Sequence, residues 1–445
     1  MAQLKLFGSA RGGARVAKRG KKEKPARQKK PLKALAIVLT VLLCLEGLYF
    51  LCIYSNIPFI VKYRTIYINT AMNTMRHQWL ATYFIPDNVI DKVRYEYGLQ
   101  VAASNGKESQ WGNAGASAEV TKPTVNEIEA EIVEEEKPDP AEQARLAREA
   151  FFEVFWEIDE ASMDAYVAEH PDVIANGWDS IHINEAGIED EGTNIESIYG
   201  EQVLGIDAAN GVLLLRVKGK GYRGVLAVGK NPAALSVGTC STYGTVGQKI
   251  GVTAEEHDGV LAMNASGFLD PGGNGNGGTV AGYAMSNGEE YGSHFTQWAY
   301  KRIELREDNR FYIKDASAPT GDGTTDATEF QPAMIIDGVK YTTDVWTDSN
   351  PRACIGQSDK YEILMLVIEG RLWLEGINGT SVNTCSDILL QHGCMQAMNL
   401  DGGSSAMMWF DGKYVMRSSS PDNRYNGGRP APNAWVYKAA GTFEE

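Results

Sequence analysis

The segment Leu400–Ser405 is the clearest candidate for chemistry in the sequence. It reads Leu-Asp-Gly-Gly-Ser-Ser and follows an apolar run that is typical of a buried strand. Such a strand would hold Asp401 in place, while Gly402 and Gly403 would let the backbone approach a ligand and expose its N–H groups. Asp401 could then serve as an acid, a base, a nucleophile or a cation ligand. The alternative is a turn that is capped by its own Asp and Ser side chains.

A second polar turn follows the apolar run 260–263. That run delivers Asn264 to a turn of small residues, with Phe268 after it and a Gly/Asn-rich loop that continues to residue 278. A loop of this kind either wraps a ligand or connects two strands. It is not a nucleotide-binding P-loop, because no Lys-Ser/Thr pair ends it.

Two arginines lie in turns rich in Gly, Pro and Asn. Arg352 belongs to Asn-Pro-Arg-Ala-Cys-Ile-Gly at a predicted strand start, and Arg429 belongs to Gly-Gly-Arg-Pro-Ala-Pro-Asn. A guanidinium group can bind two phosphate oxygens at once, so both residues are candidates for holding a phosphate. The alternative for each is an ordinary ion pair.

The elements that must position these residues are short strands, which begin at about residue 170. Several are apolar at nearly every position, which predicts that both faces of their sheet are covered. Residues 141–169 and 385–395 have helical patterns. We therefore predict an α+β domain at 141–445, with a mixed, largely β core at about 200–440 and flanking helices. The clearest predicted strands are 212–217, 224–228, 260–263, 311–313, 334–336, 361–368 and 434–437.

The N-terminal region carries a different signal. Residues 34–53 form an apolar run with one charge, Glu46, and twenty helical residues can cross a hydrocarbon core of roughly 30 Å. We predict a transmembrane anchor at 34–54, with a cleaved signal peptide as the alternative. The basic tail, residues 1–33, would then be cytoplasmic, and the C-terminal domain of this single-pass protein would be extracellular.

Charge and composition describe the region between anchor and domain. Residues 1–33 hold 12 of the 42 basic and one of the 57 acidic residues, so residues 34–445 have a formal charge of −26. A chain this acidic is a poor candidate for nucleic-acid binding. We predict a juxtamembrane helical segment at 55–101 and a disordered acidic linker at 102–140.

The cysteines leave two alternatives open. Four of them follow the anchor and could form disulfides or remain buried thiols. Their spacing contains no Cys-x-x-Cys or Cys/His cluster, so a structural zinc site is not predicted. The four are Cys240, Cys354, Cys385 and Cys394.

Together, these segments resemble the phosphodiester glycosidase family over about residues 200–440. The family pattern has an Asn turn before an aromatic residue, a Pro-Arg strand start, a Leu-Asp-Gly-Gly turn with Ser, and an arginine before the last strand. The turn Asn-Ala-Ser-Gly-Phe departs from the family's usual Asn-Gly-Gly, which puts the substrate in question more than the fold. The matching positions are Asn264–Phe268, Pro351–Gly356, Leu400–Ser405 and Arg429.

The resemblance implies a hydrolase that cleaves a sugar-1-phosphodiester linkage in a bacterial envelope or exopolysaccharide glycan. It implies that Asp401 and Asn264 are catalytic, with Asp270 or a divalent cation as a second group. No cofactor is otherwise indicated. The alternatives are a non-catalytic module that binds phosphorylated envelope glycans and a hydrolase of another bond, which would need a nucleophile–base pair. The implied substrate-binding residues are Arg352, Gly402, Gly403, Ser404, Ser405, Phe268 and Arg429.

Overall fold

The computed structural model describes residues 29–73, 78–111, 139–270, 275–295, 300–342 and 348–443. The chain divides into two units, residues 1–61 and 62–445. The first unit contains α1 (Lys29–Tyr54), which over Lys33–Tyr54 is long and apolar enough to cross a membrane. An N-terminal signal sequence would have the same properties. Most of the predicted cytoplasmic tail lies outside the described residues.

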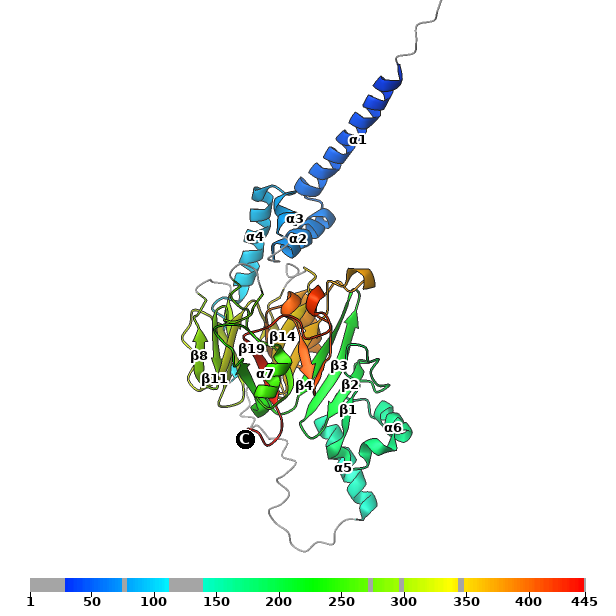
Figure 1. Ribbon diagram of the computed structural model, residues 1–445, viewed down its shortest axis with the longest axis vertical. Coiled ribbons are helices and arrows are strands. Elements are labelled where there is room, and N and C mark those ends of the chain that lie inside the picture. The colour runs from blue at the N-terminus through cyan, green and yellow to red at the C-terminus, as the bar shows by residue number, and fades with distance from the viewer. Residues whose placement is uncertain are drawn as a thin grey trace, which may run out of the picture. The chain divides into compact units, whose positions relative to one another are not determined.

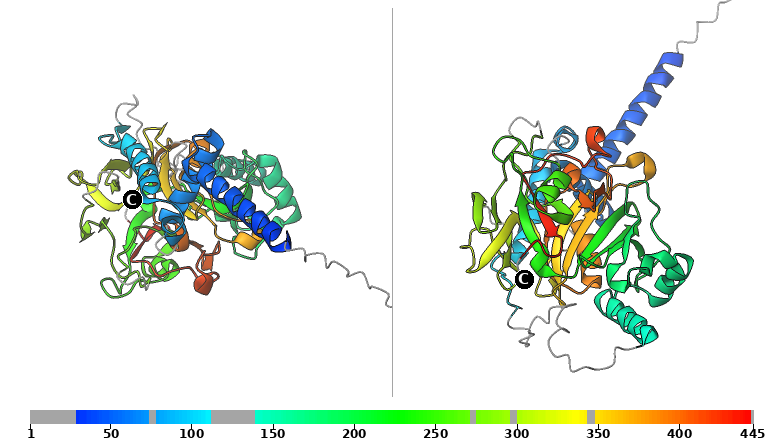
Figure 2. Two further views of the ribbon diagram at one scale, coloured as in Figure 1. Left: turned by 90° about the horizontal axis from the view of Figure 1, so that it is seen from above. Right: turned by 60° about the horizontal axis from the view of Figure 1, so that its bottom comes forward.

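A nine-stranded antiparallel sheet forms the largest layer of the second unit (Figures 1 and 2). Its central strands β15 and β14 are buried along their whole length, as the apolar run 361–368 predicted for β15. In spatial order the strands are β1 (His182–Asn184), β2 (Gln202–Asp207), β3 (Val212–Gly219), β4 (Tyr222–Gly229), β15 (Ile363–Ile368), β14 (Arg352–Ser358), β16 (Cys394–Asn399), β12 (Ala333–Ile336) and β13 (Val339–Lys340).

Both faces of this sheet pack against other elements, which explains why β15 is apolar at every position. The odd-numbered residues of β15, Ile363 to Val367, join a core shared with Trp435 and Phe410 of a second sheet. The even-numbered residues, Leu364 to Ile368, join a core that includes Phe155 and Leu389 from the helical side. The period of two along a strand therefore distributes its side chains between two cores. The predicted α+β class with a largely β core is confirmed.

Two smaller antiparallel sheets complete the β structure. The second sheet consists of β18 (Lys413–Tyr414), β17 (Met408–Phe410), β6 (Gly259–Asn264), β19 (Asn433–Lys438) and β5 (Leu235–Thr239). The third consists of β10 (Phe311–Asp315), β9 (Lys301–Arg306), β11 (Thr324–Phe330), β7 (Tyr283–Ser286) and β8 (Glu289–Gly292).

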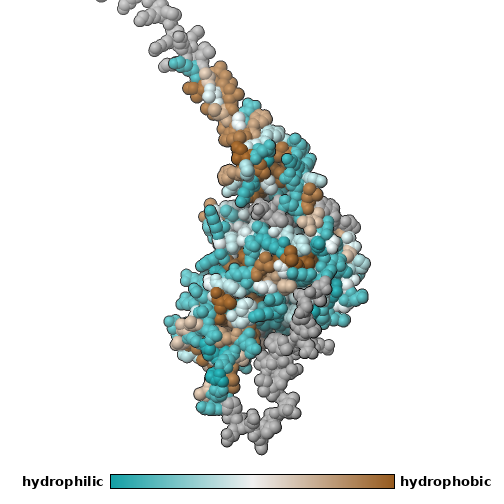
Figure 3. Space-filling view, turned by 180° about the vertical axis from the view of Figure 1, so that it is seen from behind, coloured by the Kyte–Doolittle hydropathy of each residue, from teal (hydrophilic) through white to brown (hydrophobic). Residues whose placement is uncertain are grey.

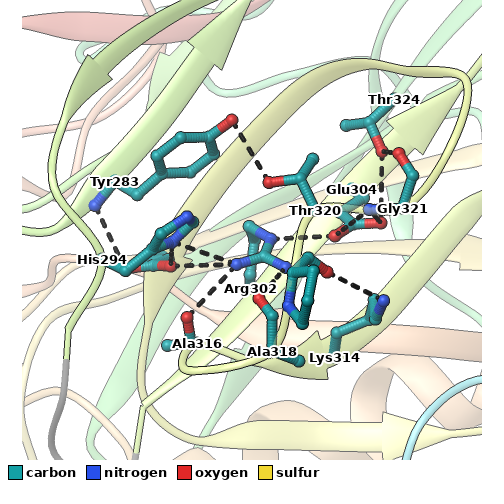
Figure 4. Close-up of polar contacts among 12 residues, drawn as sticks. Tyr283, His294, Arg302, Glu304, Lys314, Ala316, Ala318, Thr320, Gly321 and Thr324 are labelled. Carbon is teal, nitrogen blue, oxygen red and sulfur yellow. Dashed lines mark hydrogen bonds and ion pairs between the residues drawn. The ribbon is translucent and has the colours of Figure 1, made fainter.

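The third sheet contains a buried cluster of charged residues, drawn in Figure 4. Arg302 has no exposed surface and lies 2.8 Å from Glu304 and 3.3 Å from Glu329. It also donates to the carbonyl oxygens of Ala316 and Ala318. Buried charges are tolerated when they are paired and hydrogen-bonded in this way.

The predicted helix 141–169 is wrong as a single element. The structure has two helices there, α5 and α6, because the chain turns at Asp159, whose carboxylate accepts a 2.8 Å bond from Ser162 N and caps α6. The predicted helix 385–395 likewise ends earlier, since residue 394 begins β16. The helices are α2 (Pro58–Met72), α3 (Trp79–Thr82), α4 (Asp87–Val101), α5 (Pro140–Val154), α6 (Glu160–Glu169), α7 (Ile250–Glu256) and α8 (Val382–Gln391).

The start of the predicted linker packs on the domain. Ser109 N donates to Ile313 O over 3.0 Å, and the Trp111 indole donates to Phe311 O over 2.5 Å. Residues 112–138, the greater part of the predicted linker 102–140, lie outside the described residues. All six cysteines are described, and each is a free thiol.

Candidate active site

The Asp401 segment crosses from the nine-stranded sheet to the second sheet. It leaves β16 after Asn399 and enters β17 at Met408. Leu400 N donates to Ala353 O over 2.8 Å, and Gly403 N donates to Pro351 O over 3.0 Å. The loop is thereby fixed to the start of β14, and Asp401 lies where two sheets meet.

The two glycines are required by close contacts. A Cβ atom on Gly402 would lie 2.6 Å from Pro351 O. Gly403 has a φ of +63°, and a Cβ there would lie 3.3 Å from the guanidinium of Arg371. The first contact excludes larger residues for steric reasons, and the second position favours glycine for its backbone conformation.

Asn264, at the end of β6, holds this loop. Its side-chain nitrogen donates to Asp401 O over 2.8 Å, and its side-chain oxygen accepts a bond from Met407 N over 3.1 Å. The residue is 1% exposed. We therefore assign Asn264 to positioning the 401–407 loop rather than to contact with a substrate, in contrast to the catalytic role that the resemblance implied.

Asp401 is the carboxylate with the most distinctive environment. Burial raises its pKa to about 6, against the opposing effects of a hydrogen bond from Ser405 and of the positive charges of Arg429 and Arg371. Tyr300 is also close, because the charge of Asp401 contributes to raising the pKa of that phenol, after burial. A carboxyl group that titrates near neutrality can both accept and donate a proton.

Arg352 does not have the environment that the phosphate hypothesis requires. Its guanidinium is buried and lies 3.0 Å from the carboxylate of Asp348. It also donates to the carbonyl oxygens of Asp348 and Thr380, over 2.7 and 3.1 Å. These contacts neutralise the charge and fix the loop before β14, so the structure supports a structural role and not a phosphate contact.

Arg371 is the functional candidate that the sequence analysis missed. Its guanidinium lies over Gly403 and donates to the side-chain oxygen of Asn350 over 3.0 Å. Within the described residues, no carboxylate lies at ion-pair distance from it. Burial lowers its pKa, with a further contribution from Arg352, while Asp401 acts in the opposite direction. Its φ of +58° is unusual for a residue with a side chain, and such strain is common at functional sites.

A sequence signal for Arg371 does exist. It comes shortly after the apolar strand β15 and directly after Gly370, so it is also a polar residue beside a glycine at the end of a buried strand. Arg352 was predicted in its place because it lies in a turn that contains Asn and Pro.

Arg429 is the second arginine whose positive charge acts on Asp401. It forms a 2.9 Å ion pair with Asp270, and its guanidinium carbon lies 4.7 Å from the ring centroid of Phe268. Its backbone N–H points to Ser404 O at 3.4 Å. Phe268 and Asp270 therefore orient Arg429, and Asp270 is engaged in this pair rather than free to act as a second catalytic carboxylate.

The predicted site residues thus come together in part. Ser405 binds Asp401, and Ser404 accepts from Arg429 N and from the Ser418 hydroxyl. In the portion of the chain that the structure describes, no three His, Cys, Asp or Glu side chains are grouped so that they could hold a metal ion.

Solved structures similar to this chain share little sequence with it. The catalytic domain of zebrafish N-acetylglucosamine-1-phosphodiester alpha-N-acetylglucosaminidase, auto-inhibited by its pro-peptide, is 14% identical, with 51% of this chain and 82% of that chain covered and a TM-score of 0.41. A hypothetical protein from Synechocystis is 15% identical, with 54% and 65% covered and a TM-score of 0.35. An exported protein from Burkholderia pseudomallei is 13% identical, with 49% and 74% covered and a TM-score of 0.36.

Comparison with whole families is more specific. No curated protein matches the chain in sequence. Residues 257–438 match the model of the phosphodiester glycosidase family, and this region contains Asn264, Arg371, Asp401 and Arg429. The resemblance predicted from the motifs is therefore confirmed as a similarity: residues 257–438 are similar to the phosphodiester glycosidase family.

Proposed function

We propose that this domain hydrolyses the bond between the anomeric carbon of a sugar and the phosphate of a phosphodiester. The observation that carries the proposal is the position of Asp401, whose pKa is raised to about 6, in the fields of two arginines, Arg371 and Arg429. The carboxylate supplies a base, and the guanidinium groups supply charge for the phosphate. The same loop also contains Ser404, whose hydroxyl is a further candidate for binding the substrate.

The chemistry divides between these groups. Water adds to the anomeric carbon, the bond from that carbon to the phosphate oxygen breaks, and a phosphate monoester leaves. A phosphate monoester has a second pKa of about 6, so its dianion is a good leaving group that needs positive charge more than a proton. Arg371 and Arg429 stabilise that charge. Asp401 in its ionised form accepts the proton of the attacking water, or attacks the anomeric carbon itself.

We also propose that the domain acts outside the cell on envelope or exopolysaccharide glycans. The support is the apolar helix α1, with the basic residues 1–33 before or at its start. Protease added to intact cells should remove the domain. Complete protection of the domain would contradict this topology.

The experiment that tests the activity uses the full chain in detergent with a small N-acetylglucosamine-1-phosphodiester, the class that names the zebrafish relative. Release of a phosphate monoester and free sugar supports the proposal. Tight binding without release would favour the non-catalytic module. Release of a sugar phosphate would mean that the other phosphoester bond is cleaved and would contradict the proposed reaction.

A further inference from the structure

The helices that follow α1 expose a row of aromatic side chains. On α2, Tyr63 and Tyr67 stand four residues apart and so share one side of the helix, with 56% and 44% of their surface exposed. On α3 and just after it, Trp79 and Tyr83 are 48% and 80% exposed, and their rings lie 6.4 Å apart. A hydrogen bond of 2.7 Å from the Tyr67 hydroxyl to Leu80 O joins the two helices. Phe59 and Phe84 are exposed as well.

Chain continuity restricts where this face can be. Only residues 55–57 separate α1 from α2. Four extended steps reach roughly 14 Å at most, and the polar headgroup layer is about 5–8 Å thick on each side of the bilayer. If α1 spans the membrane, α2 must begin in or beside that layer. Tyr and Trp are enriched there because their rings have an apolar body and a polar edge.

The charge of residues 55–86 is also consistent with a position in the lipid headgroup layer. Residues 55–86 contain no Asp or Glu, whereas they contain Lys62, Arg64 and Arg76. Residues 34–445 as a whole carry a formal charge of −26. An acid-free basic stretch with exposed aromatic residues in such an acidic chain is suited to an anionic lipid surface.

The residue that follows α2 is connected to the candidate site by hydrogen bonds. Asn73, just after α2, donates to the Asp348 carboxylate over 3.3 Å and accepts from Arg94 of α4 over 2.8 Å. Asp348 also binds Asn350 over 2.9 Å, and Asn350 in turn accepts from Arg371. Three side chains therefore connect the helical segment to the guanidinium that lies over Gly403. In Figure 3, the helix α1, which precedes α2 in the chain, is hydrophobic over most of its surface.

We propose that the aromatic face of α2 and α3, namely Tyr63, Tyr67, Trp79, Tyr83 and Phe84, lies in the headgroup layer of an anionic membrane. The site next to it then acts on sugar phosphodiesters that are attached to that membrane. The second statement rests on the proposed function, and the first does not. A water-soluble substrate would gain nothing from this arrangement, whereas a lipid-linked glycan phosphate is concentrated where the site lies.

The lipid contact can be measured on the full chain, reconstituted in vesicles of phosphatidylglycerol and phosphatidylcholine with bromine near the headgroup end of the acyl chains. Bromine quenches nearby indoles, and Trp79→Phe removes one indole while keeping an aromatic ring. We expect brominated lipid to quench wild-type emission more than that of Trp79→Phe. Equal quenching in both would overturn the proposal, and so would protection of Trp79 by a second copy, seen as a dimer that Tyr83→Gln dissolves.

The substrate class has its own readout. Trp79→Gln with Tyr83→Gln should lower turnover of a lipid-linked sugar phosphodiester in vesicles by tenfold or more, with unchanged turnover of a soluble phosphodiester. Leu146→Gln, an exposed apolar residue on α5, is the matched control and should change neither. Equal effects on both substrates would overturn the substrate class. If the wild type turns over neither substrate, the proposed function fails, while the quenching experiment still decides the lipid contact.

Discussion

The charged cluster of the third sheet and the candidate site both contain buried carboxyl groups near arginines. The two regions differ in whether the arginines offset the effect of burial on the carboxyl pKa. Burial would raise the pKa of Glu304, yet hydrogen bonds from Arg306 and Arg302 lower it below its ordinary value. At the site, burial raises the pKa of Asp401, and neither Ser405 nor the nearby arginines compensate for it.

This difference separates charges that stabilise the fold from charges that are available for chemistry. The arginine of the first region has two carboxylate partners, whereas Arg371 lies at ion-pair distance from no carboxylate in the described residues. Fully paired buried charges hold a structure, and incompletely compensated ones are typical of sites that meet an external charge. The comparison makes Arg352, held by Asp348 and by two carbonyl oxygens, a member of the first class. Arg429 is intermediate, because it pairs with Asp270 while 21% of its side chain stays exposed.

The largest expected effect is on the paired cluster. Arg302→Met would leave Glu304 and Glu329 buried without their shared partner, so we expect the free energy of unfolding to fall by about 3–5 kcal/mol. Urea unfolding followed by circular dichroism measures this loss. Arg145→Met removes an ion-paired arginine on the exposed surface of α5 and should change little. A similar small change in both variants would contradict the stabilising role of the cluster.

Removing the charge of Asp401 should raise the free energy of unfolding, whereas Arg302→Met lowers it. Burial raises the pKa of folded Asp401 to about 6 from an ordinary value of 3.8, so the folded state loses stability as pH rises from about 4 to 6. This difference in pKa corresponds to about 3 kcal/mol of stability at most. We expect Asp401→Asn to be more stable than the wild type at pH 7, by up to that amount, and equally stable below pH 4. A variant that is less stable at pH 7 would mean that the carboxylate caps the turn.

The two arginines near Gly403 can be compared by the same substitution. Arg371→Lys keeps the charge but loses the planar pair of donors, and a hydrogen bond between charged groups contributes about 1.5–3 kcal/mol. We expect kcat/KM for a phosphodiester to fall roughly tenfold to a hundredfold, with little change for an uncharged glycoside. An equal loss on both substrates would show that Arg371 supports the loop rather than the phosphate.

Arg352→Lys should give the smallest effect, and we expect it on stability rather than on turnover. Lysine can keep the pair with Asp348 but loses the bond to Thr380 O, which lowers stability by about 1 kcal/mol. Turnover of the folded protein should be unchanged. A greater loss of phosphodiester turnover than in Arg371→Lys would restore the assignment that the sequence suggested.

More of the fold than of the candidate site could be predicted from the sequence. Strands β3, β4, β12 and β15 of the nine-stranded sheet were predictable because neighbouring residues such as Leu364 and Met365 must both be buried. Asp401 was predictable because an apolar strand and two glycines fix it locally. The choice between Arg352 and Arg371 was not, since Asp348 and Thr380 become partners of Arg352 only through the fold. Strand β9, with Lys301, Arg302 and Glu304, is buried through pairings that no local pattern reveals.

The most direct test of the catalytic role of Asp401 is the rate at which Asp401→Asn hydrolyses a sugar-1-phosphodiester. The rate is measured as phosphate monoester released and is compared with that of the wild type from pH 5 to 8. We expect wild-type activity to rise as Asp401 ionises near pH 6, and the variant to fold normally and be slower by about a hundredfold or more. A folded Asp401→Asn protein that hydrolyses the substrate at close to the wild-type rate, with the same dependence on pH, would contradict the account.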